Sequence, residues 1–299
     1  MSPRLRRIAV LASALALSCT ATAHERRAPA PAAAAQASPA ARWREDVATM
    51  SAATDAAGRR AFLRQRLQAA GMPSTSQAFE YQSQAGENLV AAVSGPASLP
   101  LLMIGAHSDR VEEGRGATDN ASGSATALAL AERFHDRPLQ HHRVAVAFWD
   151  LEELGMRGSA AYVAQGRERP ALYVNFDVFG WGDSLWMMSP DADSPLADIS
   201  RDTAKSAHLQ ITVGAMYPPS DHRSFLAAQW PAVSYSMIDA SEIPGILAEF
   251  GGRTPDPMPK VMTVIHSPND TVAQIDADAA AKGVDAVEAA IRAWDARTP

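Results

Sequence analysis

Short, almost wholly apolar runs recur along the sequence and constrain its fold more than any other feature. The clearest are L-L-M-I-G-A over 101–106, V-A-V-A-F over 144–148 and L-Y-V-N-F over 172–176. Because these runs are mostly apolar on both alternating faces, they are typical of strands in a sheet that is covered on both sides. A further run, N-L-V-A-A-V-S over 88–94, also predicts a strand.

Helical patterns fill the intervals between these runs. After residue 119, apolar side chains at 127, 130, 131 and 134 fall on one face of a helix. The helices expected from such patterns span 43–53, 57–70, 119–134, 155–167, 194–207, 222–229 and 275–295. Alternating strands and helices predict an α/β fold, a three-layer α/β/α sandwich around a mixed, mostly parallel sheet. Sites in such folds lie beyond the carboxyl ends of the strands.

The first residues have the pattern of an export signal. Arginines at 4, 6 and 7 precede an apolar run from Ile8 to Leu17, and Ala21-Thr22-Ala23 resembles a cleavage site. The apolar run is much shorter than the roughly 20 residues that a membrane-spanning helix needs. We therefore expect residues 1–23 to be removed on export to the periplasm or the cell exterior, and we expect no transmembrane anchor.

Residues 24–42 are rich in alanine and proline and predict a flexible linker. A single folded domain is expected over 43–299, beginning at Trp43. Cys19 is the only cysteine, so no intramolecular disulfide can form. Cys19 is discarded with the signal peptide or, in the alternative, lipidated, although Ala16-Leu17-Ser18 before it is a poor lipobox.

The charge of the chain argues against a nucleic-acid partner. Lys and Arg number 27 against 33 Asp and Glu, which gives a net charge of −6. Loss of the three arginines in residues 1–23 would make the charge (27 − 3) − 33 = −9. No basic stretch lies outside that segment. A monomer is favoured, and the sequence leaves the oligomeric state open.

Histidine and carboxylate residues follow the predicted strands directly. His107 and Asp109 follow the first apolar run, Glu152 and Glu153 follow the second, and Asp177 follows the third. Taken alone each is a weak signal, because a His-x-Asp pair is usually a hydrogen-bonded loop and adjacent glutamates are usually solvated. Together they predict a site at one edge of the sheet.

Two further residues extend this set. Asp119 opens the helix pattern after the first run, where by default it would be an N-cap, and His266 follows the apolar segment V-M-T-V-I. Nitrogen and carboxylate ligands without thiolates fit zinc, with cobalt or manganese as substitutes. The sequence therefore predicts a metal site.

The same stretches make the sequence similar to a known family, the zinc-dependent M28 aminopeptidases. The resemblance rests on G-A-H-S-D at 105–109, G-A-T-D-N-A-S-G at 116–123, F-W-D-L-E-E-L-G-M-R-G-S at 148–159, N-F-D at 175–177, S-D-H-R-S-F at 220–225 and H-S-P-N-D-T at 266–271. These segments occur in the family's order. The resemblance implies a catalytic domain of the zinc-peptidase and phosphorylase-like fold that removes N-terminal residues from peptides with a free N-terminus.

The family's site, carried over to this sequence, implies two Zn²⁺ ions. His107 and Asp177 would hold one ion, and Glu153 and His266 would hold the other. Asp119 would bridge them. Two metals roughly 3.5–4 Å apart need such a shared carboxylate.

The resemblance also implies roles for residues that hold no metal. Glu152 would be the general base for a water between the zinc ions, and Asp109 would orient His107. Tyr217 stands four residues before Asp221, the position from which some relatives donate a hydrogen bond to the oxyanion. The alternative is a loop tyrosine packed on the neighbouring prolines.

Other functions remain open beside this one. Glutaminyl cyclases keep a similar arrangement around a single zinc and act as acyltransferases, but they differ at the counterpart of D-N-A-S-G, which has the peptidase form here at 119–123. A non-catalytic ectodomain of the same fold is another interpretation, although every ligand position is filled and Glu152 is present. A zinc carboxypeptidase would need a lid domain between Asp177 and His266, and the main sheet already requires that segment.

Overall fold

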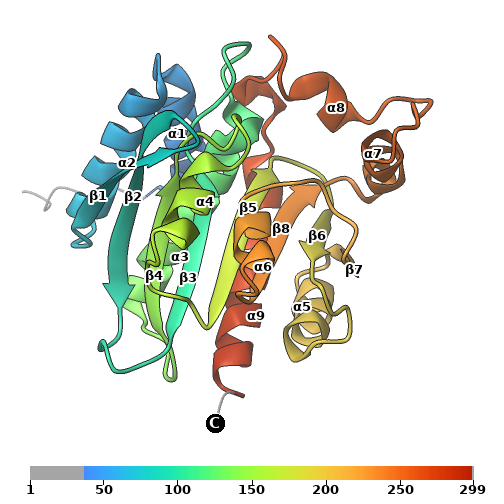
Figure 1. Ribbon diagram of the computed structural model, residues 1–299. Coiled ribbons are helices and arrows are strands. Elements are labelled where there is room, and N and C mark those ends of the chain that lie inside the picture. Colours follow the sequence, from blue (N-terminus) through green and yellow to red (C-terminus); the bar gives the residue numbers. More distant parts are fainter. Residues whose placement is uncertain (1–36, 298–299) are drawn as a thin grey trace, which may run out of the picture. The chain divides into compact units, whose positions relative to one another are not determined.

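The computed structural model describes residues 37–297, so the expected signal peptide and most of the expected linker lie outside the described residues. Eight strands of the described part form one sheet in the order β1-β2-β4-β3-β5-β8-β6-β7 (Figure 1). Their bounds are β1 Ser74–Tyr81, β2 Gln84–Ser94, β3 Leu101–His107, β4 Arg143–Trp149, β5 Leu172–Phe179, β6 Ser184–Met188, β7 Gln210–Gly214 and β8 Ala232–Ile238.

The centre of the sheet is parallel. Strand β3 pairs in parallel with β4 on one side and with β5 on the other, and β5 pairs in parallel with β8. Antiparallel pairs β1–β2 and β2–β4 extend one edge, and β8–β6 extends the other. The prediction of a mixed, mostly parallel sheet is confirmed. Because β4, β3 and β5 are parallel neighbours, their carboxyl ends meet at one edge.

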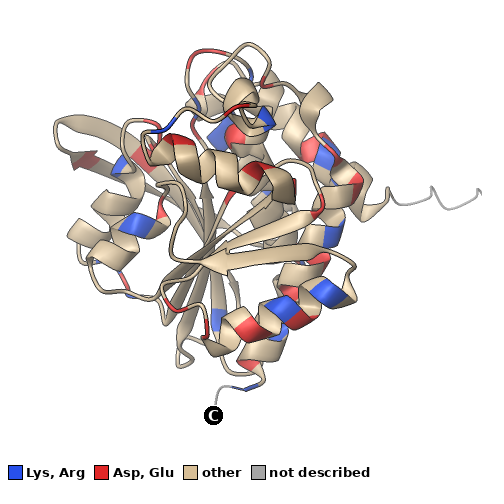
Figure 2. Ribbon diagram, turned by 90° about the vertical axis from the view of Figure 1, so that its right-hand side faces the viewer, with Lys and Arg blue, Asp and Glu red and all other residues tan. Residues whose placement is uncertain are grey.

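Helices cover both faces of this sheet. They are α1 Pro39–Ala52, α2 Ala56–Ala69, α3 Gly123–Asp136, α4 Arg157–Ala164, α5 Pro195–Ser206, α6 His222–Ala227, α7 Ile243–Phe250, α8 Lys260–Val264 and α9 Ala277–Asp295. Helices α4 and α6 lie on one face, and α1, α3 and α9 lie on the other. In Figure 2 the strands are almost entirely uncharged, while Lys, Arg, Asp and Glu concentrate on the surrounding helices and loops.

Alternation along β3 divides its side chains between two cores. Leu102 and Ile104 pack in the cluster that contains α3 and α9, whereas Leu101 and Met103 pack in the cluster beneath α4 and α6. This two-sided burial explains why the strand sequence is apolar at every position from 101 to 106. The prediction of a three-layer α/β/α sandwich is confirmed.

Helix α1 begins earlier than the sequence analysis expected. Its first residue is Pro39, and the side chain of Ser38 accepts a hydrogen bond from the Ala41 N–H at 3.2 Å. A serine N-cap followed by proline in the first turn favours a helix start, and this signal lies inside the Ala/Pro-rich stretch that was assigned to the linker. Helix α1 thus begins four residues before Trp43. None of the helices among residues 37–297 has the length and apolarity required to cross a membrane.

Candidate active site

Strand register brings the expected residues to one edge of the sheet. His107 is the last residue of β3 and lies beside Trp149, the last residue of β4. Asp177 lies within β5, where pairing with β8 shifts between Phe176 and Phe179. Such a bulge changes the direction in which nearby side chains point. The side chain of Asp177 lies at this bulge and points toward His107.

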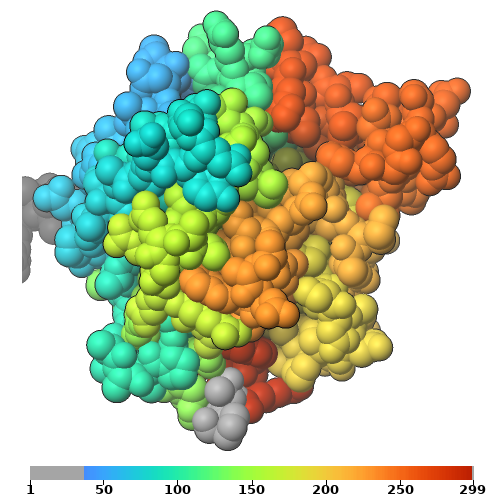
Figure 3. Space-filling view, in the orientation of Figure 1, coloured from blue at the N-terminus to red at the C-terminus, as the bar shows by residue number. Residues whose placement is uncertain are grey.

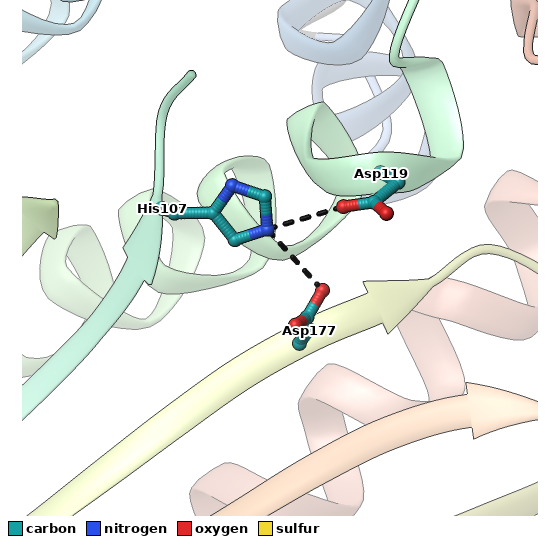
Figure 4. Close-up of side chains that lie close together, drawn as sticks. All are labelled: His107, Asp119 and Asp177. Atoms are coloured by element: carbon teal, nitrogen blue, oxygen red, sulfur yellow. Dashed lines mark ion pairs between the residues drawn. The ribbon is translucent and has the colours of Figure 1, made fainter. Parts of the chain in front are cut away.

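The first cluster joins His107, Asp119 and Asp177 (Figure 4). His107 Nε2 lies 3.1 Å from Asp119 Oδ1 and 3.5 Å from Asp177 Oδ1. Asp119 belongs to an irregular turn, Ala117–Ser122, that precedes α3. The three side chains come from two strands and the start of a helix, and all are largely or fully buried.

The second cluster joins the other oxygen of Asp119 to Glu153 and His266. His266 Nε2 lies 3.1 Å from Asp119 Oδ2 and 3.0 Å from Glu153 Oε2. The His266 side chain is 51% exposed, against 9% for each carboxylate, so the second cluster faces the solvent side of the site. Asp119 thus presents one oxygen to each imidazole.

These donor atoms fit two metal ions. The side-chain atoms of His107, Asp119 and Asp177 form one group of three potential ligands, and those of Asp119, Glu153 and His266 form another. Within the described residues, buried atoms at these positions, including His107 Nε2, Asp119 Oδ1 and Asp177 Oδ1, make no hydrogen bond. Buried polar atoms without hydrogen bonds are costly, and a divalent cation would satisfy them with the nitrogen and oxygen ligands that zinc accepts.

Asp109 connects the histidine of the first cluster to the loop after β4. Its Oδ1 lies 3.4 Å from His107 Nδ1 and accepts a hydrogen bond from the Glu152 N–H at 3.1 Å. Its Oδ2 accepts a hydrogen bond from the Glu153 N–H at 3.2 Å. The carboxylate of Asp109 therefore lies against one imidazole and binds the backbone N–H groups of both glutamates.

Glu152 lies beside the clusters without joining either ligand group. Its Oε2 is 4.0 Å from His107 Nε2, and its side chain lines the cavity. Burial raises the pKa of Glu152 well above its usual range, while the charge of His107 opposes the shift. Asp221, which is fully buried behind this position, has a pKa raised by burial to about 7.

The carboxylates around the histidines hold both imidazoles in their charged form when no metal is bound. Contacts with Asp119 and Glu153 raise the pKa of His266 to about 10. Burial alone would lower the pKa of His107, but the charges of Glu152 and Asp177 raise it well above its usual range. The same two imidazoles lower the pKa of Asp119, although its burial acts in the opposite direction.

Two residues that the sequence analysis did not assign hold the turn that carries Asp119. Asp270 accepts hydrogen bonds from the N–H groups of Thr118 at 2.6 Å and Asp119 at 3.1 Å. Asp270 lies in the H-S-P-N-D-T segment that supports the family resemblance, but the sequence did not indicate that it binds the turn carrying Asp119.

Arg59 on α2 is the second of these residues, and its side chain is fully buried. Its guanidinium donates hydrogen bonds to the backbone carbonyls of Asp109 at 3.1 Å, Arg115 at 2.7 Å and Gly116 at 2.8 Å. Burial lowers its pKa to about 10. A Cβ on Gly116 would lie 2.7 Å from Arg59 Nη2, so this glycine makes room for the guanidinium. The sequence around Arg59 predicts a helix with several arginines, and no local pattern distinguishes Arg59 from the others.

Tyr217 lines the same cavity with its ring 4.7 Å from that of Trp186. Its hydroxyl contacts the hydroxyl of Ser236 and accepts a hydrogen bond from Ser234 at 3.4 Å. Ser236 in turn donates to the backbone carbonyl of Asp177. Burial raises the pKa of Tyr217, so its hydroxyl is protonated at neutral pH.

A cavity of about 330 Å³ opens beside the carboxylates. Its floor is acidic, and the opposite wall is apolar. That wall comes largely from α7, α8 and β6, with Ile246, Phe250, Val261, Met262 and Trp186 among its residues. Residues of α7 and α8 pack with Trp181 and Ile238 in a hydrophobic cluster separate from the two that flank the sheet. Neither helix was among the predicted elements.

The sequence of the chain is similar to sequences of known proteins. The chain matches the sequence profile of peptidase family M28 over residues 88–291. Leupeptin-inactivating enzyme 1 of Streptomyces exfoliatus is 31% identical over 252 residues, which cover 80% of this chain and 55% of that enzyme. The chain therefore spans little more than half the length of this curated relative.

Two solved structures share the fold. A zinc aminopeptidase from Bacillus subtilis is 22% identical, with a TM-score of 0.57 over 72% of this chain and 51% of that one. A glutaminyl cyclase from Porphyromonas gingivalis is 16% identical, with a TM-score of 0.68 over 85% of this chain and 98% of that one. At these identities the similarity establishes the architecture alone.

Proposed function

Because the chain belongs to peptidase family M28, we propose that it is a zinc-dependent aminopeptidase that releases the N-terminal residue of peptides. The observation that carries the proposal is the position of Asp119, whose two oxygens lie 3.1 Å from two different imidazoles. A carboxylate in this position suits a pair of metal ions that share a ligand.

His107 and Asp177 are the proposed ligands of one zinc, Glu153 and His266 those of the other, and Asp119 is the proposed bridge. When bound, the zinc ions would polarise the scissile carbonyl and activate a water held between them. Asp109 keeps His107 in place through Nδ1, which leaves Nε2 free to bind metal. The identity of the donors, nitrogen and carboxylate oxygen without sulfur, favours zinc.

Glu152 is the proposed general base. It lines the cavity but belongs to neither ligand group, so its carboxylate is free to accept the proton of the attacking water. It then delivers this proton to the leaving amine. Its position is fixed from the backbone, because the Glu152 N–H donates to Asp109.

Tyr217 is the proposed donor to the oxyanion. Its protonated hydroxyl lies in the cavity wall and now contacts Ser236. Donation to the substrate requires the O–H to turn from Ser236 toward the carbonyl oxygen, a rotation that leaves the ring in place.

The proposed substrate is a peptide with a free N-terminus and an apolar first residue. The acidic floor of the cavity attracts the ammonium group, and the wall formed by α7 and α8 accepts an apolar side chain. The alternative, a cyclase-like acyltransferase with one zinc, predicts one zinc equivalent and release of a cyclised product.

A panel of aminoacyl nitroanilides, assayed with and without a chelator, tests the proposal. We expect cleavage of leucyl and related apolar substrates that is lost with chelator and restored by zinc. Comparable cleavage of N-acetyl-leucyl nitroanilide would contradict an exopeptidase, and activity that survives exhaustive chelation would contradict a metal mechanism.

Export is a separate proposal, since residues 1–23 lie outside the described structure. We propose that a signal peptidase cleaves after Ala23 and that the mature protein is a periplasmic or secreted monomer. Mass spectrometry of the protein recovered from its native host tests this, because retention and acylation of Cys19 would indicate a lipoprotein instead.

A further inference from the structure

A second hollow adjoins the cavity on the face that carries α4 and α6. It is an open groove of about 530 Å³, lined by Tyr81 at the end of β1, by Gln82 in the turn that follows and by residues of the two helices. It shares Gly155 and Met156 with the cavity, so the two hollows are separated by a single ridge. In Figure 3 the lime α4 and the orange α6 lie side by side, and the cavity opens above them beside the orange-red segment around α8.

Two arginines line this groove, the half-buried Arg157 at the start of α4 and the exposed Arg223 in α6. Across residues 37–297 neither guanidinium has an ion-pair or hydrogen-bond partner, and Arg157 Nε is buried without one. By contrast, two half-buried arginines elsewhere in the chain pair with carboxylates: Arg66 pairs with Asp46 at 2.8 Å, and Arg133 pairs with Glu288 at 2.9 Å. Two unpaired cations in one groove stand out in a chain of net charge −6.

The guanidinium of Arg157 lies at the ridge itself. Its Cζ and Nη2 atoms are 3.9 Å from the position that a Cβ on Gly155 would occupy. The Gly155 N–H donates to the Glu152 carbonyl at 2.7 Å, so the ridge begins at the turn that carries the proposed base. A peptide whose first residue fills the cavity and whose scissile bond faces Glu152 can leave over this ridge, where it meets Arg157 first and Arg223 beyond it.

We propose that Arg157 and Arg223 bind the C-terminal carboxylate of short peptide substrates. The inference rests on the proposed aminopeptidase function and specifies its substrates as oligopeptides of a few residues. A carboxylate matches the hydrogen-bonding geometry of a guanidinium group, and it is the anionic group that a short peptide with a free C-terminus carries. A groove of this volume holds only a few residues beyond the ridge, which favours a chain end over an internal acidic side chain.

The experiment compares leucine release from Leu-(Ala)n peptides, with n from one to four, as free acids and as C-terminal amides. We expect kcat/KM to favour the acid by about five- to tenfold at one or two lengths, where the carboxylate reaches the arginines, and to fall to parity elsewhere. The difference should lie in KM and should shrink as salt is raised. A Leu-Ala-Glu-amide arm separates a terminal carboxylate from an acidic side chain, and we expect no comparable gain from it.

Substitutions of the two arginines test whether the preference for the free acid depends on the groove. In Arg157→Gln and Arg223→Gln the acid-to-amide ratio should fall toward one, and in Arg157→Glu it should fall below one. Arg42→Gln is the matched control, because Arg42 is exposed on α1 beside a different hollow and its loss removes the same charge. That variant should keep the wild-type ratio.

Three results would overturn the inference. They are an acid-to-amide ratio of one at every length in the wild type, a ratio that survives in both arginine variants, and a loss in Arg157→Gln that is equal for acids and amides. An equal loss for acids and amides would mean that Arg157 acts only through its positive charge near the acidic site and does not bind the substrate carboxylate. A failure of the proposed function is distinguishable, since it would abolish leucine release from every peptide and from leucyl nitroanilide alike.

Discussion

Glu152 and Glu153 are consecutive residues whose carboxylates face different histidines. Glu153 Oε2 lies 3.0 Å from His266 Nε2, whereas Glu152 Oε2 lies 4.0 Å from His107 Nε2. The backbone N–H groups of both donate to Asp109, which holds the pair in this divergent arrangement. Two side chains of identical chemistry are thereby available for two tasks.

Glutamine substitutions should separate these tasks. Glu152→Gln keeps the shape of the side chain but cannot accept a proton, so kcat should fall by on the order of 10²–10⁴ while both zinc ions remain bound. Glu153→Gln should lose zinc, and added zinc should restore part of its activity. Kinetics combined with metal analysis checks both variants. If Glu152→Gln were the variant that lost zinc, the assignment of base and ligand would be reversed.

Asp119→Asn should weaken both metal sites together, because each oxygen of Asp119 faces one cluster. The wild-type protein should hold close to two zinc equivalents, and the variant should lose both in parallel during chelator titration. Loss of a single equivalent with the other unaffected would contradict a bridging role.

Zinc binding should release protons. In the metal-free protein the pKa of His266 is raised to about 10, so this imidazole is charged at pH 8 and must lose its proton to bind zinc. The ion pairs of the charged imidazole stabilise the metal-free fold fully below pH ~6.5 and are lost as the pH rises through about 10. Calorimetry in buffers of different ionisation enthalpy measures the release, and its absence at pH 8 would argue against His266 as a ligand.

Arg59→Met should destabilise the protein and weaken zinc binding together. The substitution leaves three carbonyls without their donor, and we expect a loss of at least about 2 kcal/mol in the free energy of unfolding. Arg64→Met on the same helix removes a half-exposed ion pair with Glu87 and should cost less than about 1 kcal/mol. Denaturant unfolding with zinc present and absent compares them, and equal effects would show that Arg59 has no special role at the Asp119 turn.

Tyr217→Phe should lower kcat by about 10²-fold if the hydroxyl donates to the oxyanion. Ser236→Ala is the matched control, because it removes the same hydroxyl contact but leaves the Tyr217 hydroxyl in the cavity. Its kcat should fall much less. Equal losses in the two variants would indicate that the contact with Ser236 only positions the ring.

The sequence predicted the fold class and the grouping of ligands because both depend on short-range patterns. His107 ends β3, Glu152 follows β4 and Asp177 lies near the end of β5, and parallel pairing brings the ends of these strands together. Arg59 was not predictable in this way, since its partners are backbone carbonyls of distant loops. Every residue has a backbone carbonyl, so the sequence does not indicate which carbonyls will bind a buried guanidinium.

Strand β8, which the sequence patterns missed, contains serine at two positions inside an otherwise apolar run. In β8, A-V-S-Y-S-M-I, Ser234 and Ser236 interrupt the apolar run, yet both are buried. Ser234 accepts a hydrogen bond from Asn175 at 3.1 Å, and Ser236 donates to the Asp177 carbonyl. Their hydroxyl groups are satisfied by partners more than fifty residues away, which local patterns do not reveal.

The apolar cluster of α7 and α8 is separate from both cores of the sheet, while His107 and Asp177, two of the proposed zinc ligands, lie in strands β3 and β5. Changes of side-chain size on α7, which carries no proposed ligand, should therefore alter the shape of the cavity without repacking these two strands. The set of N-terminal residues that the cavity accepts could therefore change, in evolution or by design, while the strands that hold His107 and Asp177 keep their positions.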